Sequence, residues 1–223
     1  MQTLKQSSTH FEFYYWNERD ANVITELIEL LENRYYHMSS RLKCSLNDKV
    51  IVKVYSELDV LHKAFGIINA SEWIVGRTQN NCIECLSPLA LHSIYNSEDI
   101  KKVYIHELAH LFVNTNFKNI LPVLSEGMAT YEANQNYLEN AFNCILDESK
   151  GNYLKFDQFC SLNHSNKYLY AYAYSFTTFV VHLYGEQTFV AFLLDKDLFL
   201  NKGQSIYNLW IKNHIDSKNG SNN

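Results

Sequence analysis

The chain has 223 residues, of which 47% are hydrophobic and 19% are charged, and its formal net charge is −5. This length suits one domain or one domain with two lobes, and the low content of glycine and proline is typical of a compact, helix-rich globule. The negative net charge gives no basis for binding nucleic acid or an anionic membrane.

No targeting or membrane segment is expected. The chain has no apolar run of the roughly 18 residues that a membrane-spanning helix needs, and residues 1–10 lack the apolar stretch of a signal peptide. We therefore expect a cytoplasmic protein, with an already processed secreted form as the alternative.

The five cysteines are an odd number scattered along a fairly large chain, so we expect reduced thiols rather than a disulfide framework. Cys82 and Cys85 have the C-x-x-C spacing of a zinc knuckle or redox pair. No second pair follows, and an extended segment would point the two sulfurs to opposite faces. Ordinary core or surface thiols are the expected outcome.

The first part of the chain alternates between strand and helix patterns. Aromatic or β-branched content predicts strands at 10–16 and 49–55, and apolar residues at helical spacing predict an amphipathic helix lying on the sheet at 21–40. Ser56 is expected to cap a short helix that ends at Gly66. Between 71 and 88 we predict two short strands: Trp73 to Val75 precede a polar turn that begins at Gly76-Arg77, and Cys82 to Leu86 follow it.

Residues 103–112 read V-Y-I-H-E-L-A-H-L-F and contain His106, Glu107 and His110 in the order H-E-x-x-H. The acidic and capping residues at 96–99 predict a helix start, and the helix is expected to run to about Asn114. Chance would produce on the order of 0.02 such motifs in this composition.

On a helix the two histidines fall one turn apart on the same face, where both imidazoles can bind one Zn²⁺. Glu107, about 100° further round, is placed to hold a water molecule rather than the metal. The helix is apolar nearly all round and is therefore expected to be buried, where polar side chains need partners. A buried cluster of polar side chains that satisfy one another is the alternative.

The second part of the chain is predicted to be mainly helical and rich in tyrosine. A connection is expected at 117–122 and a loop at 163–166. The candidate helices are 124–134, 138–146, 168–184, 186–194 and 204–211.

A catalytic zinc ion takes three protein ligands and leaves a fourth position for water. Glu126 is the first acidic residue after His110, with 15 residues between them, enough for a turn back onto the first helix. Gly127 and Ala129 would let the two helices approach closely. A solvated acid at position 126, or Glu132 as a competing ligand, are the alternatives.

The segment S-E-G-M-A-T-Y at 125–131 resembles the E-G-x-A-x-Y segment that supplies the third ligand in gluzincin metallopeptidases. Together with H-F-E-F-Y-Y, V-I-V-K-V-Y, W-I-V-G, H-E-L-A-H and Y-A-Y-S leading to Y-G, it makes most of the chain similar to the peptidase MA-like family, relatives of the thermolysin and aminopeptidase type. Two departures are Ser125, where many relatives have Asn, and a shorter gap to Glu126 than in thermolysin. Ser125 affects one hydrogen bond of the kind that orients ligand histidines.

This resemblance implies an α+β, zincin-like fold, with a small N-terminal sheet and helices, the H-E-x-x-H helix, and a mainly helical C-terminal lobe. We expect a single catalytic domain over 1–223, with sub-lobes at about 10–117 and 118–215. The implied activity is zinc-dependent hydrolysis of a peptide or protein substrate, with one Zn²⁺ per chain held by His106, His110 and Glu126, and Glu107 as the general base. Residues 81–87 are the candidate strand for pairing with extended substrate backbone, and an ordinary interior strand is the equal alternative.

Gluzincins commonly supply a tyrosine or histidine from a later helix to stabilise the oxyanion. Tyr172 and Tyr174 lie about 200° apart on a helix, so both cannot face the metal, and spacing alone does not choose between them. The family-like Ala171-Tyr172-Ala173 favours Tyr172, because small neighbours leave room for its hydroxyl. Packing roles for both tyrosines are the alternative.

Two further classes of protein remain for comparison. A zinc-binding regulatory or interaction protein would retain the site without peptidase turnover. A purely structural interaction module would need no metal.

Overall fold

The computed structural model describes residues 2–67 and 70–220, and it divides the chain into two compact units, Met1–Asn116 and Phe117–Asn223. The first unit contains a sheet with helices and the second contains helices, so the α+β class is confirmed at that level. The assignment of 1–223 as a single catalytic domain stays a prediction. Within the described residues, no helix combines the length and the apolar character that crossing a membrane requires.

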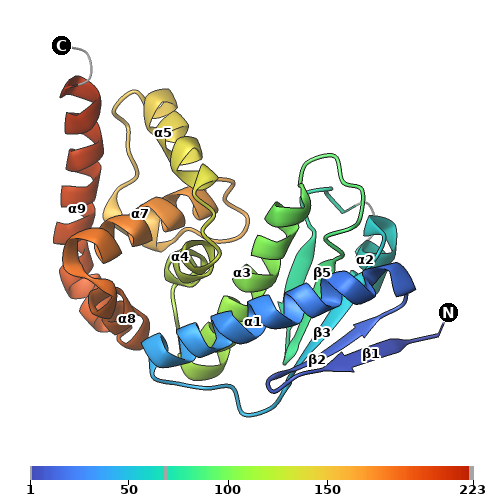
Figure 1. Cartoon of the computed structure of the whole chain (residues 1–223). Coiled ribbons are helices and arrows are strands. Elements are labelled where there is room, and N and C mark those ends of the chain that lie inside the picture. The colour runs from blue at the N-terminus through green and yellow to red at the C-terminus, as the bar shows by residue number, and fades with distance from the viewer. Residues whose placement is uncertain (1, 68–69, 221–223) are drawn as a thin grey trace. The chain divides into compact units, whose positions relative to one another are not determined.

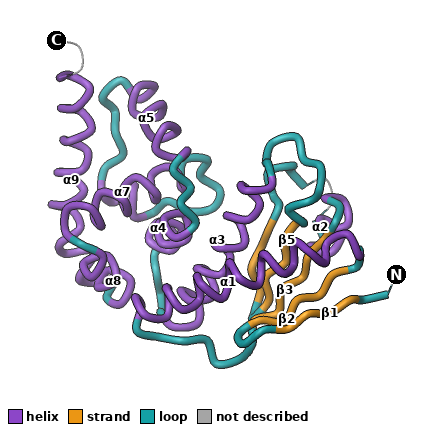
Figure 2. Tube along the Cα trace, in the orientation of Figure 1, coloured by secondary structure: helices purple, strands orange, loops and turns teal. Residues whose placement is uncertain are grey.

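The sheet of the first unit has five strands in the order β1-β2-β3-β5-β4 (Figure 2). The inner strands β2, β3 and β5 run parallel, and β1 and β4 pair antiparallel at the two edges. The sheet is therefore mixed. The strands are β1 (Leu4–Ser7), β2 (Phe11–Tyr15), β3 (Val50–Tyr55), β4 (Gly76–Gln79) and β5 (Cys82–Leu86).

One face of the sheet is apolar and lies under two helices, α1 (Ala21–Leu42) and α3 (Ser97–Asn116) (Figure 1). Side chains on alternate strand positions point to this face and are fully buried, as the pleat requires. The helix and strands predicted at 21–40, 10–16 and 49–55 are confirmed. The fully buried strand residues on this face are Phe11, Phe13, Val50, Val52, Val54, Ile83 and Cys85.

The opposite face carries an ion-pair network around the buried carboxylate of Glu84. Arg77 donates from Nε (2.8 Å) and Nη2 (2.6 Å) to one carboxylate oxygen, and Lys53 Nζ lies 3.1 Å from the other. Burial alone would raise the pKa of Glu84, but hydrogen bonds from Arg77 and Lys53 outweigh it and hold that pKa below its usual value. Arg77 also bonds the Phe65 carbonyl, so the network ties the end of α2 (Leu58–Phe65) to β4.

Two details of the sequence prediction were wrong here. The first of the two short strands is Gly76–Gln79 rather than the apolar triplet before it, and the turn is at Asn80, whose positive φ of 53° an asparagine tolerates. Ser56 does not cap α2, because its hydroxyl donates instead to the buried carboxylate of Asp20 at 2.7 Å. Gly66 ends α2 as expected, with φ 70°.

The strand at 81–87 is an interior strand. β5 lies between β3 and β4, so both of its edges are already hydrogen-bonded and it has none left for a substrate. β4 is the edge strand on this side of the sheet. Of the two alternatives that the sequence left open for 81–87, the interior strand is therefore confirmed. Local patterns could not choose between them, because strand order depends on the crossover connections.

The second unit is helical. Helices predicted at 124–134, 138–146, 168–184 and 186–194 are confirmed with small shifts of their ends, whereas α6 was not predicted and α9 is far longer than 204–211. The helices are α4 (Pro122–Glu132), α5 (Tyr137–Ser149), α6 (Phe156–Cys160), α7 (Leu169–Tyr184), α8 (Glu186–Leu194) and α9 (Lys196–Gly220).

The core of this unit is aromatic. Phe142 stacks on Trp210 with ring centroids 4.7 Å apart, and it meets Tyr172 edge to face at 5.1 Å. Phe159 and Phe176 extend the same cluster. Rings at these distances add to the stability that their burial already gives, so α5, α6, α7 and α9 share one core.

Helices α4 and α7 pack closely because α4 carries a glycine at the contact. A Cβ built on Gly127 would lie 2.1 Å from Thr177 Oγ1 and 3.1 Å from the Ala173 carbonyl oxygen. Any larger residue at 127 would therefore push the two helices apart.

We predict that Gly127→Ala lowers the free energy of unfolding by about 1–3 kcal/mol, because the added methyl group overpacks this contact. Denaturant unfolding measures the loss. Adding Thr177→Ala should restore part of it, since it removes the nearest atom. Thr177→Ala alone is the matched control, because that hydroxyl has no hydrogen-bond partner within the described residues. Full stability in the single glycine variant would contradict the close packing.

Candidate metal centre

Helix α3 starts where the sequence predicts and ends at Asn116, two residues beyond the expected end. Asn96 and Asp99 cap it reciprocally: the Asp99 amide donates to Asn96 Oδ1 at 3.0 Å, and the Asn96 amide donates to Asp99 Oδ2 at 3.3 Å. Tyr104 then fixes the helix to the sheet, because its buried hydroxyl donates to the Leu86 carbonyl at 2.8 Å. These contacts hold the H-E-x-x-H segment rigidly against the sheet.

The two histidines of α3 point their Nε2 atoms at each other, 3.0 Å apart, and their rings meet edge to face. His106 is buried and His110 is half-buried. Two nitrogens bound to one tetrahedral zinc at about 2.05 Å would be about 3.3 Å apart. The observed separation is close to this value, so the pair fits one metal ion.

Glu107 is buried beside the pair and is held by a residue from β4. Thr78 Oγ1 lies 2.7 Å from Glu107 Oε2 and 2.9 Å from the Glu107 main-chain oxygen. A hydroxyl that donates to a carboxylate fixes the orientation of that carboxylate. Thr78 could not be selected from the sequence, because only the pairing of β4 with its neighbours brings it to α3.

β4 reaches α3 because it carries a glycine at the point of contact. A Cβ on Gly76 would lie 2.5 Å from Val103 Cγ1 and 2.7 Å from Cys85 Sγ, distances that real Cβ atoms do not show. Two residues further along, Thr78 points to the same face of the strand. The absence of a side chain at 76 thus allows the hydroxyl at 78 to reach Glu107.

Glu126 lies on α4 and is 1% exposed. One of its carboxylate oxygens and one nitrogen from each of His106 and His110 all lie within 4.8 Å of one another, so these three residues could hold a metal ion. Two imidazoles and a carboxylate are a donor set that divalent transition metals accept. Glu132 is buried as well, but it is not part of this group.

A histidine from the loop predicted at 163–166 lies close to Glu126. His164 Nδ1 is 3.6 Å from Glu126 Oε1, and its side chain is largely exposed. A histidine in a polar N-H-S-N loop carries no sequence pattern that marks it as functional, so His164 could not be predicted from the sequence.

Tyr172 lies in the aromatic core of the second unit, with Phe142 and Trp210 against its ring. Burial raises the pKa of its hydroxyl, so the group remains a hydrogen-bond donor at neutral pH. Tyr174 is also buried. This setting favours the packing roles that the sequence left open, and the role of Tyr172 as oxyanion donor stays a prediction.

The C-x-x-C pair forms no site. Cys82 and Cys85 are three residues apart on β5, so their sulfurs point to opposite faces of the sheet. Cys85 is buried against Gly76, and burial raises the pKa of its thiol. All five cysteines of the chain are free thiols.

Comparison with known proteins adds no assignment. No protein-family model matches the chain, and no curated protein matches it. What the site can do chemically therefore follows from the geometry of its own residues.

We predict that the purified chain binds about one divalent metal ion, and that His106→Ala and Glu126→Gln each weaken binding because they remove a ligand. Metal content after dialysis against limiting zinc measures this effect. His182→Ala, which removes an exposed histidine on α7, is the matched control. Unchanged zinc affinity in the His106 variant would place the site elsewhere.

Proposed function

We propose that the protein is a zinc-dependent peptidase of the gluzincin type, with a zincin-like fold related to the peptidase MA-like family. The observation that carries the proposal is the grouping of His106, His110 and Glu126 beside a buried glutamate one position after the first histidine. This arrangement combines a set of metal ligands with a candidate proton acceptor.

Zinc is the metal that best suits the donor set. Two imidazoles and one carboxylate are the ligands of many catalytic zinc sites, which keep a fourth position for water or substrate. A bound zinc ion supplies a Lewis acid that lowers the pKa of a water molecule and polarises a carbonyl group. One zinc ion per chain is the proposed stoichiometry.

Glu107 is the proposed general base. Its carboxylate would take the proton from the attacking water and pass it to the leaving amine. The Thr78 hydroxyl bonds one carboxylate oxygen of Glu107, Oε2, at 2.7 Å. The other oxygen, Oε1, is therefore the one proposed to accept the proton. Thr78 is thus a positioning residue that acts through Glu107.

A peptide or protein substrate suits the first unit because β4 is an edge strand beside α3. An extended peptide can add to such an edge through main-chain hydrogen bonds. The strand proposed to pair with the substrate is therefore β4 and not the segment 81–87, because β5 is interior. For the oxyanion, the hydrogen-bond donor proposed from the family resemblance is Tyr172. His164 is a second candidate donor, because it lies near Glu126.

The proposed function is tested first by turnover of a broad peptide library with the zinc-loaded chain. Cleavage that disappears on chelation and returns with zinc is the expected result. Stoichiometric zinc without cleavage of any peptide would instead favour a zinc-binding regulatory protein, and absence of zinc binding would favour a structural module.

We predict that Glu107→Gln lowers turnover by about 10²–10⁴-fold with zinc still bound, because the amide keeps the shape of the side chain but cannot accept the proton. Initial rates and zinc content measured on the same sample check this. Glu98→Gln, on an exposed turn of the same helix, is the matched control. Full activity in the Glu107 variant would exclude this mechanism.

We predict that Thr78→Val lowers kcat by about tenfold and leaves KM and zinc content nearly unchanged, because the carboxylate loses the bond that orients it. Thr78→Ser should restore most of the rate, since it keeps the hydroxyl. Loss of activity in both variants alike would mean that the methyl group of Thr78, and hence packing, is what matters.

A further inference from the structure

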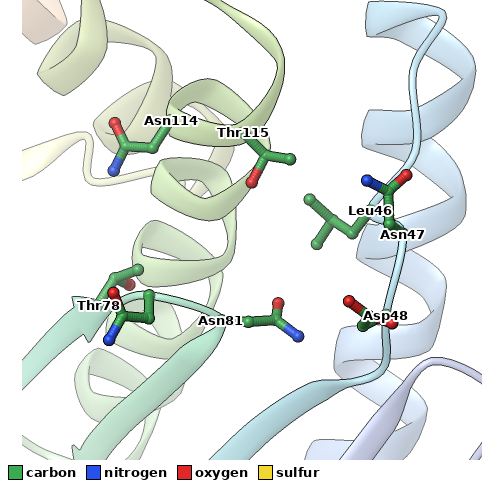
Figure 3. Close-up of a pocket in the computed structure, with 8 residues that line it drawn as sticks. Leu46, Asn47, Asp48, Thr78, Asn81, Asn114 and Thr115 are labelled. Atoms are coloured by element: carbon green, nitrogen blue, oxygen red, sulfur yellow. The ribbon is translucent and has the colours of Figure 1, made fainter.

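The first unit contains an open polar pocket at the end of α3 (Figure 3). Three segments distant in the sequence line it: the residues before β3, the end of β4 with the turn that follows it, and the last turn of α3. Its volume is about 360 Å³, which falls within the range of small-ligand pockets and is ample for one long side chain. The buried side chain of Leu46 contributes the apolar part of the lining.

The chemistry of the lining is acidic and amide-rich. Half of the eight lining residues are asparagines, whose side-chain oxygens accept hydrogen bonds. Asp48 is the one charged residue among these eight described residues. The neighbouring Lys49 does not neutralise it by pairing, because its ammonium group donates to Ser7 Oγ at 3.2 Å and to the Ser8 carbonyl at 2.6 Å.

The end of α3 adds negative potential to the same pocket. Asn114 and Thr115 lie in the last turn of the helix, where the unpaired carbonyl groups carry a partial negative charge. Cationic side chains commonly occupy this position in helices, but the last turn of α3 contains no basic residue. The pocket therefore combines a carboxylate, amide oxygens and a helix C-terminus, all of which favour a cation.

The pocket adjoins the proposed catalytic residues within the first unit. Thr78 lines it and also contacts Glu107. Asn114 follows His110 by four residues, so it lies on the same face of α3, about 6 Å further along the helix axis. A peptide paired with β4 would thus pass the mouth of the pocket within one or two residues of the bond to be cleaved.

We propose that this pocket is a substrate subsite that selects a lysine or arginine side chain, with Asp48 as the specificity-determining residue. The inference rests on the proposed peptidase function and names its substrate class. A guanidinium or ammonium group would donate to Asp48 and to the asparagine oxygens, while its alkyl stem would lie along Leu46. Asp48 is exposed, so its contribution to selectivity is moderate and decreases with salt.

Turnover of paired peptides tests the selectivity. The pairs differ at one residue near the cleaved bond, arginine in one and its uncharged isostere citrulline in the other. We expect the zinc-loaded chain to prefer arginine by about two- to fivefold in kcat/KM at low salt, the range of an exposed ion pair. Asp48→Asn should remove the preference, and Asp48→Lys should reverse it. Asp59→Asn, an equal change of charge on α2 outside the pocket, should keep it.

A binding measurement separates this inference from the peptidase proposal, because it needs no turnover. Acetyl-arginine amide is titrated into the full chain labelled with ¹⁵N, and acetyl-citrulline amide serves as the uncharged control. We expect saturable chemical-shift changes of the amides at 80–81 and 114–115 with the arginine probe but not with the citrulline probe. Asp48→Lys should abolish these changes. Such binding without any peptide cleavage would refute the peptidase and leave only the selectivity of the pocket for a cationic side chain. Three outcomes would overturn the subsite. They are no chemical-shift changes at these residues, equal changes with both probes, and a preference for arginine that is unchanged in Asp48→Lys.

Discussion

The close approach of β4 to α3 is the constraint on which the candidate site in the first unit depends. It is possible because position 76 has no side chain where Val103 and Cys85 crowd the backbone. From there the pleat of β4 brings Thr78 to Glu107, and the turn after β4 places Asn80 in the lining of the pocket at the end of α3. The lack of a side chain at 76 thus allows the edge strand to lie close to both the buried carboxylate of Glu107 and the polar pocket.

The α3 helix has two different environments along its length. Its middle is buried and anchored, with Tyr104 bonded to β5 and His106 and Glu107 removed from solvent. Its last turn is exposed at Asn114 and Thr115. Rigid burial suits groups that must hold a metal ion and a proton acceptor in fixed geometry, whereas an exposed polar end suits recognition of a side chain that enters from water.

The second unit contributes differently. Its stability comes from an aromatic core and from the close packing of α4 with α7 at Gly127, the residue directly after Glu126. The carboxylate is therefore presented by a helix with little freedom to move, and His164 comes to it from a loop. The tyrosines of α7, prominent in the sequence, take part in this core, where Tyr172 contacts Phe142 and Trp210.

The sequence by itself determined most helices and strands, because these follow from local periodicity, and it also pointed to the three residues that could hold a metal ion. An i, i+4 pair of histidines needs only a helix to come together, and the grouping with Glu126 followed from a motif with its own local pattern. Only the tertiary structure decided that β5 is interior, that β4 is the edge, and that Thr78 and Asp48 border the same region as Glu107 and Asn114. Those relations join residues about 30 to 70 positions apart through sheet order and crossover connections, which no local pattern of side chains encodes.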